Sequence, residues 1–442
     1  MDTVRIKSIV FYVIVSIIVI AYFFIRLPEL KTAFFIGTTL PYDFPQDYIA
    51  GRQLLAGKTL YPPDFVTMYR NLLASSGGAV NPQINHLNAH PPFTALLLYP
   101  LWLFSFHNAA VIWGAITILC SFAISLLLMK AEDASLMYVP LLSLFILAWP
   151  PFQANVAVGQ VSVLVALFVS AGWYLYKKHK DLLAGIFITL ATMLKFYPGL
   201  LLLYFLFEKK YKLFWSSIAG IVIIMVITLI LTKYDVFHFL FTILPADSKY
   251  SGADIGNLSI NGYFAKLFLS VKAYYITGTF AASENYVLKN IFLAIAVALL
   301  LFYSALSIRK YRYDNDLGFS VFIVVSLLVS PLCWNHYLTL LLLPLIVFAK
   351  ELLQKRTISE VVLFLTGLFF ISIDTSSVYF LKVLSIVRGI IPGNPESFFY
   401  RMTFYSLPFY GMVLLLYLNF RLIKNYSTSA LHDTEGGGAA LD

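Results

Sequence analysis

Runs of apolar residues about as long as a membrane crossing recur along the whole chain, and they limit its possible folds more than any other feature. A transmembrane helix needs roughly 20 mostly apolar residues, because the bilayer core is about 30 Å thick. With 60% hydrophobic and only 12% charged residues, a water-soluble fold of this size would lack polar surface. We therefore predict an all-α polytopic membrane protein. The candidate helices are 8–27, 109–129, 136–150, 158–176, 213–232, 286–307, 318–331, 335–349, 359–379 and 401–423.

The ends of these runs carry the charge of the chain. Basic residues cluster there, so we assign the net charge of +9 to orientation in the membrane and expect no nucleic-acid partner. The first run, from about Ile9 to Leu27, is too long for a signal-peptide core and lacks a small-residue cleavage site, so we expect it to stay as an anchor. Cys120 and Cys333 match neither a disulfide framework nor zinc-ligand spacing and suit packing positions.

Two apolar regions, 92–106 and 182–207, each allow more than one path through the membrane. Either both are single spans, or 92–106 lies on the surface and 182–207 folds back as two short spans hinged at Lys195. The second choice places the basic clusters on the side of the N-terminus, as the positive-inside rule requires. These clusters are Arg5, Lys7, Lys130, Lys177, Lys178, Lys180, Lys209, Lys210, Lys212, Arg309, Lys310, Arg312, Lys350, Lys355, Arg356, Arg421 and Lys424.

We prefer the second path, which predicts about 12 transmembrane helices, cytoplasmic termini and a juxtamembrane helix at 92–106 on the outer face. A single kinked span over 182–207 is the alternative, since each arm has only about 13 residues, or near 20 Å. We expect one membrane domain over 1–426 and a disordered polar tail over 427–442. The segments expected on the outer face are 28–108, 150–157, the turn at Lys195, 233–285, 331–335 and 380–400.

The segment 42–65, YDFPQDYIAGRQLLAGKTLYPPDF, follows the first apolar run and carries two acids at helix-turn spacing. Asp43 and Asp47 lie close to hydrocarbon, where charged side chains are costly and usually functional. Either aspartate also suits a helix N-cap in a solvated loop. Arg52, in the same segment, can pair with one of these acids or bind a phosphate.

The order Asp-Phe, Tyr-x-Ala-Gly-Arg-x-Leu-Leu-x-Gly and Leu-Tyr in this segment resembles the first outer loop of glycosyltransferase family 87. That family belongs to the GT-C superfamily of polyprenyl-phosphate-sugar-dependent transferases. Further elements resemble the family in the same order along the chain. They are His90-Pro91-Pro92, Gly159-Gln160, Ala184-Gly185 with Lys195-Phe196-Tyr197-Pro198, Asn257-Leu258-Ser259-Ile260-Asn261-Gly262 and Ser330-Pro331-Leu332-Cys333-Trp334-Asn335-His336-Tyr337.

The resemblance implies a GT-C-like helical bundle with Asp43 as the catalytic aspartate. Asp47 stands where the family more often has an aromatic residue, so either acid can be the base. Lys195 lies between two apolar arms and has no acid nearby in the sequence. Because a buried ammonium without an anion is costly, this position suits binding of a lipid phosphate. The alternative is a lysine that snorkels to the membrane interface. We assign Tyr197, from the same element, to the substrate site with it.

The other candidate binding residues each have a structural alternative. Histidine titrates near neutral pH, so His336 suits a phosphate or a sugar hydroxyl, or else a packed position with hydrogen bonds. Trp334 offers a flat face to a sugar or an isoprenoid, or anchors the chain at the interface. Asn257 and Ser259 either contact sugar hydroxyls or form turns.

His90 and Gln160 complete the predicted substrate-binding set. His90 either binds substrate or orients the surface helix that follows it. Gln160 stands at a helix start, where it either binds substrate or caps the helix.

Together these features predict an inverting glycosyltransferase that moves a hexose, mannose by the resemblance, from a polyprenyl phosphate to a glycolipid or glycan acceptor. Asp43 would take the acceptor proton, and Lys195, His336 and Arg52 would stabilise the departing phosphate on the outer face. We expect no cofactor and no metal, although the pair Asp43 and Asp47 leaves a weak metal alternative. The competing hypothesis is a transporter or flippase for a lipid-linked or anionic substrate among the membrane lipids.

Overall fold

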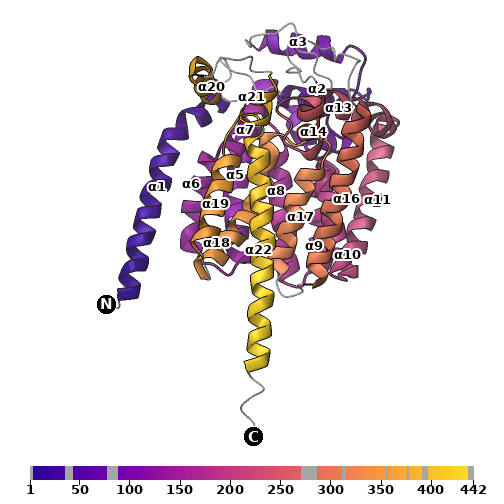
Figure 1. The fold of residues 1–442 in the computed structure, drawn as a ribbon. Helices are drawn as coiled ribbons and strands as arrows, with labels where there is room; N and C mark the ends of the chain where they lie inside the picture. Colours follow the sequence, from indigo (N-terminus) through magenta and orange to yellow (C-terminus); the bar gives the residue numbers. More distant parts are fainter. Residues whose placement is uncertain are drawn as a thin grey trace. The chain divides into compact units, whose positions relative to one another are not determined.

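The fold is that of a computed structural model, which describes residues 3–34, 43–76, 88–269, 286–310, 315–354, 357–375, 378–390 and 397–436. In these ranges all regular secondary structure is helical, which confirms the all-α prediction (Figure 1). Five segments are long and apolar enough to cross a membrane, and a sixth arises if two helices bent by 62° form one broken span. They are Phe106–Ala131, Tyr211–Thr232, Tyr286–Ser307, Asn335–Gln354 and Phe398–Asn425, with Leu136–Ala148 plus Pro150–Val158 as the bent pair. The chain is an integral membrane protein, and the total of about 12 spans stays a prediction.

The chain forms two compact units, Met1–Lys195 with Ile221–Ile243, and Phe196–Gly220 with Leu244–Asp442. Helix α11 (Tyr211–Thr232) contributes residues to both. The first unit holds α1 (Thr3–Phe34), α2 (Phe44–Leu55), α3 (Phe65–Ser75), α4 (Pro92–Leu97), η1 (Tyr99–Leu103), α5 (Phe106–Ala131), η2 (Leu136–Tyr138), α6 (Val139–Ala148), α7 (Pro150–Val158), α8 (Ser162–Lys177), α9 (Asp181–Leu194), α12 (Asp235–His238) and η4 (Phe239–Ile243). The second holds η3 (Tyr197–Leu200), α10 (Leu201–Phe207), α13 (Leu244–Tyr250), η5 (Ser251–Ala253), α14 (Ile260–Phe268), α16 (Tyr286–Lys310), α17 (Asn315–Val329), η6 (Asn335–Leu341), α18 (Leu342–Gln354), α19 (Ile358–Ile371), α20 (Val378–Ile390), α21 (Phe398–Met402) and α22 (Leu407–Gly436).

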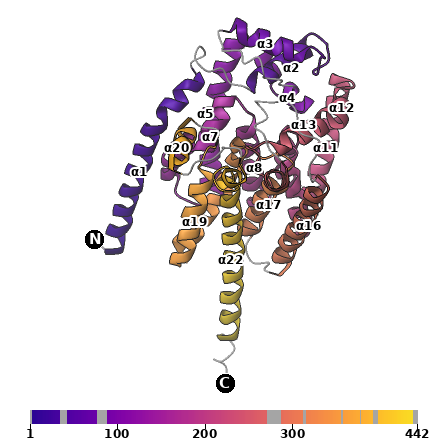
Figure 2. The ribbon, with the colours of Figure 1, turned by 45° about the horizontal axis from the view of Figure 1, so that its top comes forward.

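Helices α1, α5, α6, α8 and α9 pack side by side in the first unit. The connections from α5 to α6 and from α8 to α9 are short, so these pairs run antiparallel. An ion pair of 3.1 Å between Lys177 and Glu132 joins the C-terminal ends of α8 and α5. The C-terminal ends of α7 and α9 therefore lie at the opposite end of the bundle. Helices α2 to α4 lie where α1 ends, away from the N-terminus (Figures 1 and 2).

Helix α2 is docked on the segment that contains α4 and η1 through Trp102. A Cβ added at Gly51 would lie 2.2 Å from the Trp102 ring, so only glycine lets the α2 backbone approach this closely. Phe44 and Tyr48, on the same face of α2, place their rings 6.1 Å from that of Trp102. The Trp102 indole Nε1 donates to the Ala95 carbonyl at 2.7 Å, which fixes the ring against α4. The glycine of the Ala-Gly-Arg motif thus sets the position of α2.

Residues 92–106 do not form one helix. Helix α4 has 6 residues, η1 has 5, and α5 begins at Phe106. At 1.5 Å per residue α4 is about 9 Å long, far less than the roughly 30 Å of a bilayer core. This agrees with the path in which 92–106 does not cross. Its position on the membrane surface stays a prediction.

The region 182–207 breaks at the predicted place. Helix α9 ends at Leu194, Lys195 is extended with φ −146° and ψ 132°, and η3 begins at Tyr197. In a continuous α-helix Pro198 could not donate an N–H to the Leu194 carbonyl and its ring would clash with that carbonyl, which accounts for part of the interruption. The path of the two arms through the membrane stays a prediction.

Helix α17 forms the core of the second unit. Its residues Phe319, Val321, Phe322 and Ile323 are 0% exposed, and it packs against α10, α18 and α22. Helix α19 packs along α22 and starts with a capping box of Thr357 and Glu360. Helix α22 continues to Gly436, across the boundary at 426 that the sequence predicts. That division into a domain and a tail stays a prediction.

Candidate active site

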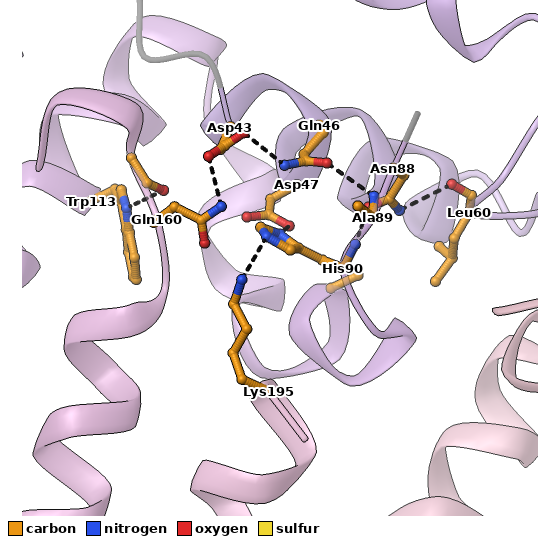
Figure 3. Close-up of polar contacts among 12 residues, drawn as sticks. Asp43, Gln46, Asp47, Leu60, Asn88, Ala89, His90, Trp113, Gln160 and Lys195 are labelled. Atoms are coloured by element: carbon orange, nitrogen blue, oxygen red, sulfur yellow. Dashed lines mark hydrogen bonds and ion pairs between the residues drawn. The ribbon is translucent and has the colours of Figure 1, made fainter. Parts of the chain in front are cut away.

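Asp43 stands at the N-cap position of α2, but its carboxylate makes no capping hydrogen bond. Instead Oδ2 accepts from Gln160 Nε2 at 2.7 Å and Oδ1 accepts from Gln46 Nε2 at 3.2 Å (Figure 3). Its backbone N–H donates to the Val158 carbonyl at 2.9 Å, which ties the start of α2 to the end of α7. Asp43 is half-buried, so part of the residue reaches solvent. The capping alternative therefore does not describe this residue.

Gln160 reaches Asp43 because Gly159 ends α7. Gly159 adopts the left-handed conformation with φ 73°, which glycine accepts without the steric cost of a Cβ. Its carbonyl accepts from Trp113 Nε1 at 3.0 Å, and the Gln160 N–H donates to the Asn155 carbonyl at 3.0 Å. The Gly-Gln element is thus a turn that aims an amide at Asp43.

Asp47 differs from Asp43, because it is buried and already engaged. It is 2% exposed, and its Oδ1 lies 2.6 Å from Nδ1 of His90, which is 3% exposed. The other ring nitrogen, His90 Nε2, lies 3.4 Å from the Nζ of Lys195, which is 8% exposed. Figure 3 shows the three side chains in a row from α2, through the His-Pro-Pro segment, to the end of α9.

Hydrogen-bond chemistry assigns the proton on His90. An ionised carboxylate only accepts and an ammonium only donates, so Nδ1 carries the hydrogen toward Asp47 and Nε2 accepts from Lys195. The His90 ring thus links the Asp47 carboxylate to the Lys195 side chain. The sequence has no acid near Lys195, and the fold provides Asp47 from α2.

A second set of hydrogen bonds holds the His90 backbone in place. The Gln46 Oε1 accepts from the Ala89 N–H at 3.0 Å, and Asn88 Oδ1 accepts from the His90 N–H at 3.1 Å. The Tyr61 hydroxyl donates to the His90 carbonyl at 2.7 Å. Burial, followed by the charges of Asp235 and Asp47, raises the pKa of Tyr61 well above its usual value, so it remains a donor.

Sequence reasoning missed these supports. The i, i+3 spacing of Gln46 from Asp43 is a signal that a helix brings the two together. Asn88 and Tyr61 carried no such signal, because their partners lie far away in the sequence. Arg52 is exposed, and its Nη1 donates to the Trp102 carbonyl at 3.1 Å rather than to either aspartate.

In the second unit, the structure brings Tyr197 and His336 together on Tyr337. The Tyr197 ring stacks on that of Tyr337 at 5.1 Å, and the His336 ring meets the same ring edge-on at 4.9 Å. His336 is buried, whereas Trp334 is half-buried beside Gly256, whose added Cβ would lie 3.2 Å from the indole. The stacked rings place both candidate residues in one cluster.

Asn257 and Ser259 are engaged within the chain. The Asn257 amide donates to the carbonyls of Gly252 and Pro331, both at 3.0 Å, and its Oδ1 accepts from the N–H groups of Ser259 and Cys333, both at 3.0 Å. Ser259 caps α14, because its Oγ accepts from the Gly262 N–H at 3.2 Å. These bonds favour the turn interpretation over sugar contact.

Lys266 is a second buried lysine that sequence reasoning left out of the site. It is 0% exposed, and its Nζ donates to the Asn257 carbonyl at 3.0 Å and the Tyr405 carbonyl at 3.4 Å. Burial lowers the pKa of Lys266 to about 7, against a smaller opposing effect of the Asp254 charge. Within the described ranges, no three histidine, cysteine or acidic side chains are grouped so that they could hold a metal ion.

Comparison with known proteins gives one family. The model of glycosyltransferase family 87 matches residues 88–331, which is more than half of the chain. No curated protein sequence matches it. The matched range includes His90, Gln160 and Lys195 but begins after Asp43 and Asp47.

Proposed function

This chain belongs to glycosyltransferase family 87, and on that premise we propose that it transfers a hexose from a polyprenyl phosphate to a lipid-linked or glycan acceptor. Its helices make it a membrane glycosyltransferase, which uses a sugar donor and an acceptor in the membrane. Mannose as the sugar and polyprenyl phosphate as the carrier rest on the resemblance of the motifs quoted above.

The contrast between the two acids carries the proposal. A general base must be reached by the hydroxyl that it deprotonates. Asp43 is half-buried and is held by two amide donors that keep its carboxylate in one orientation. Asp47 is buried, with Oδ1 on His90 and Oδ2 without a hydrogen-bond partner among the described residues. We therefore assign the base to Asp43 and a positioning role to Asp47.

In this mechanism Asp43 takes the proton of the acceptor hydroxyl as its oxygen attacks the anomeric carbon. The new glycosidic bond forms while the bond from that carbon to the phosphate oxygen breaks. The phosphate leaves with the electron pair, and the Lys195 ammonium, held by His90, stabilises its charge. His336 and Trp334 remain donor contacts that the sequence predicts. One displacement inverts the anomeric centre, so a β-linked donor gives an α-glycoside.

We also propose that Asp43 faces the outside of the cell membrane. Within the first unit, the cluster of Lys177, Lys178 and Lys180 lies at the end of the bundle opposite to Lys195. The positive-inside rule assigns that basic end to the cytoplasm. Single cysteines at Lys58 and Lys178, both exposed, are expected to react with an impermeant maleimide from opposite sides of intact cells. Labelling of both from one side would contradict the assignment.

A transfer assay tests the function. Purified protein is given polyprenyl-phosphate-mannose and a panel of glycolipid acceptors, and the product is measured by mass spectrometry. Asp43→Asn is expected to lower kcat by about 10²- to 10⁴-fold, the usual contribution of a general base. Asp64→Asn is the matched control, because Asp64 is exposed in the same loop. Full activity of Asp43→Asn would reject this residue as the base.

A further inference from the structure

A second pocket of the first unit lies outside the Asp43 cluster. It has a volume of about 450 Å³ and opens to the surface between the end of α2 and the end of α11. The residues that line it are Leu54, Gly57, Lys58, Thr59, Tyr61, Leu231, Thr232, Lys233, Tyr234, Asp235 and His238.

The pocket has a cationic lining. Lys58 and Lys233 are exposed, and neither makes an ion pair with a residue that the structure describes. Asp235 also lines the pocket, but it is 6% exposed and both of its oxygens are engaged. Oδ1 accepts from the Thr59 hydroxyl at 2.5 Å and Oδ2 from the Leu60 N–H at 2.9 Å. These donors are neutral and do not cancel a carboxylate charge, so a ligand meets two exposed lysines and one buried carboxylate, which leaves a net positive lining next to the His238 ring.

The surroundings of the pocket are those of a membrane interface. Helix α11 is one of the candidate spans, only 17% of its apolar window is buried, and it ends at Thr232. Large apolar side chains beyond that end stay exposed: Tyr234 is 83% exposed and Phe241 75%. Aromatic residues collect where hydrocarbon meets head groups. Lys233 directly follows the end of this candidate span, and Lys58 lines the same pocket.

We propose that this pocket binds the phosphate-bearing head group of an anionic membrane phospholipid. Lysine ammonium groups bind phosphate as point charges, and the pocket presents two of them at its opening. The exposed aromatic side chains supply the surface for the acyl chains. A small soluble anion uses the lysines but gains nothing from these side chains.

The pocket also connects to the backbone that carries His90. Tyr61 lines the pocket, stacks on Phe239 at 6.0 Å, and donates its hydroxyl to the His90 carbonyl at 2.7 Å. Asn88 donates to the Leu60 carbonyl at 3.4 Å, one residue from the Thr59 that binds Asp235. A lipid bound here would therefore stabilise the same loop that presents the Asp47 and His90 pair.

Lipid binding to the full chain in detergent tests the proposal without reference to glycosyl transfer. Native mass spectrometry measures adducts with dioctanoyl-phosphatidylglycerol, and the variants are Lys58→Gln, Lys233→Gln and the double variant. Each lysine is expected to contribute about fivefold to the affinity and both together about 30-fold, from roughly 1 kcal/mol for each exposed ion pair with the phosphate. Lys130→Gln, with the same charge change on exposed α5 surface, is the control and is expected to bind like the parent.

Three further measurements distinguish a lipid head group from free phosphate as the ligand, and lipid binding from the catalytic proposal. Inorganic phosphate is expected to compete only at far higher concentration than the lipid, and dioctanoylglycerol, which lacks phosphate, is expected not to bind at the pocket. Asp43→Asn is expected to keep its lipid adducts, so failure of the catalytic proposal leaves this one intact. Equal affinity of the double variant and Lys130→Gln would overturn the proposal, and so would equal binding of dioctanoylglycerol.

Discussion

Replacing Asp47 by asparagine removes the buried charge at the start of the row that ends at Lys195. The pair is 2.6 Å apart with both side chains at least nine-tenths buried, so water cannot replace the lost partner. Breaking a buried charged contact of this kind costs about 3 kcal/mol, because the partner remains desolvated. We expect Asp47→Asn to lower the free energy of unfolding by about this amount. The Asn amide can still accept from His90 Nδ1, so the fold should survive.

The same substitution should weaken binding of the sugar donor more than it slows the chemical step. Without the Asp47 charge, His90 no longer has a fixed tautomer, and the Lys195 ammonium loses the carboxylate behind it. We expect the KM for polyprenyl-phosphate-mannose to rise with a smaller change in kcat. Asp43→Asn should do the reverse, with a large fall in kcat and little change in stability, because Asp43 is half-buried.

Denaturant unfolding in mixed micelles, followed by tryptophan fluorescence, measures the change in the free energy of unfolding. A double-mutant cycle with His90→Gln isolates the pair, and a coupling of about 1.5 kcal/mol or more is expected for contacting buried partners. Steady-state kinetics on the same proteins gives the KM and kcat. Coupling near zero, or a kcat loss confined to Asp47→Asn, would refute the assignment of the two acids.

Three further predictions follow from other contacts. Gly51→Ala places a Cβ against the Trp102 ring and should destabilise the protein by about 1–3 kcal/mol, which thermal unfolding measures. Gly57→Ala is the contrast, because a Cβ added there meets no atom within 4 Å, and its only cost comes from the φ of +65° that favours glycine. Gln160→Glu sets a second carboxylate against Asp43 and should reduce kcat more than Gln160→Ala does, whereas equal losses would contradict the contact. The pKa of Lys266 is lowered to about 7, so the unfolded chain binds more protons from about pH 7 to 10 and stability should rise with pH there, by up to about 1.4 kcal/mol per pH unit. Lys266→Met should flatten that dependence in melting curves, and an unchanged slope would count against the lowered pKa of Lys266.

Local signals were enough to place several parts of the site. The apolar runs marked most of the helices, and the hinge was predicted at Lys195, where α9 ends. The turn at Gly159 was not predicted, since the sequence placed 158–176 in one helix, whereas α7 ends at Val158 and α8 begins at Ser162. A helix cap was the structural alternative for Asp43 or Asp47, and Asp43 does stand at the start of α2, although its carboxylate binds side chains and not the helix N-terminus. These features depend on residues within a turn or two of each other.

Other features of the fold and the site could not be predicted from residues close together in the sequence. The division of 92–106 into α4, η1 and the start of α5, with Trp102 packed on Gly51, is visible only in the folded chain. The interpretation of Asn257 as a turn residue depends on the carbonyl of Pro331, far along the chain. Hydrogen-bond satisfaction of this kind is a property of the folded backbone, and residue type alone does not reveal it.

By itself the sequence determined the environment of this protein and the kinds of group available for chemistry, because hydrophobic length and charge position act through the bilayer whatever the final packing. Only the tertiary structure decided that Asp43 stays open to solvent while Asp47, one turn further along, is buried against His90. Two identical side chains acquire different roles because burial and partners, and not residue type, determine whether a carboxylate can be reached by a hydroxyl.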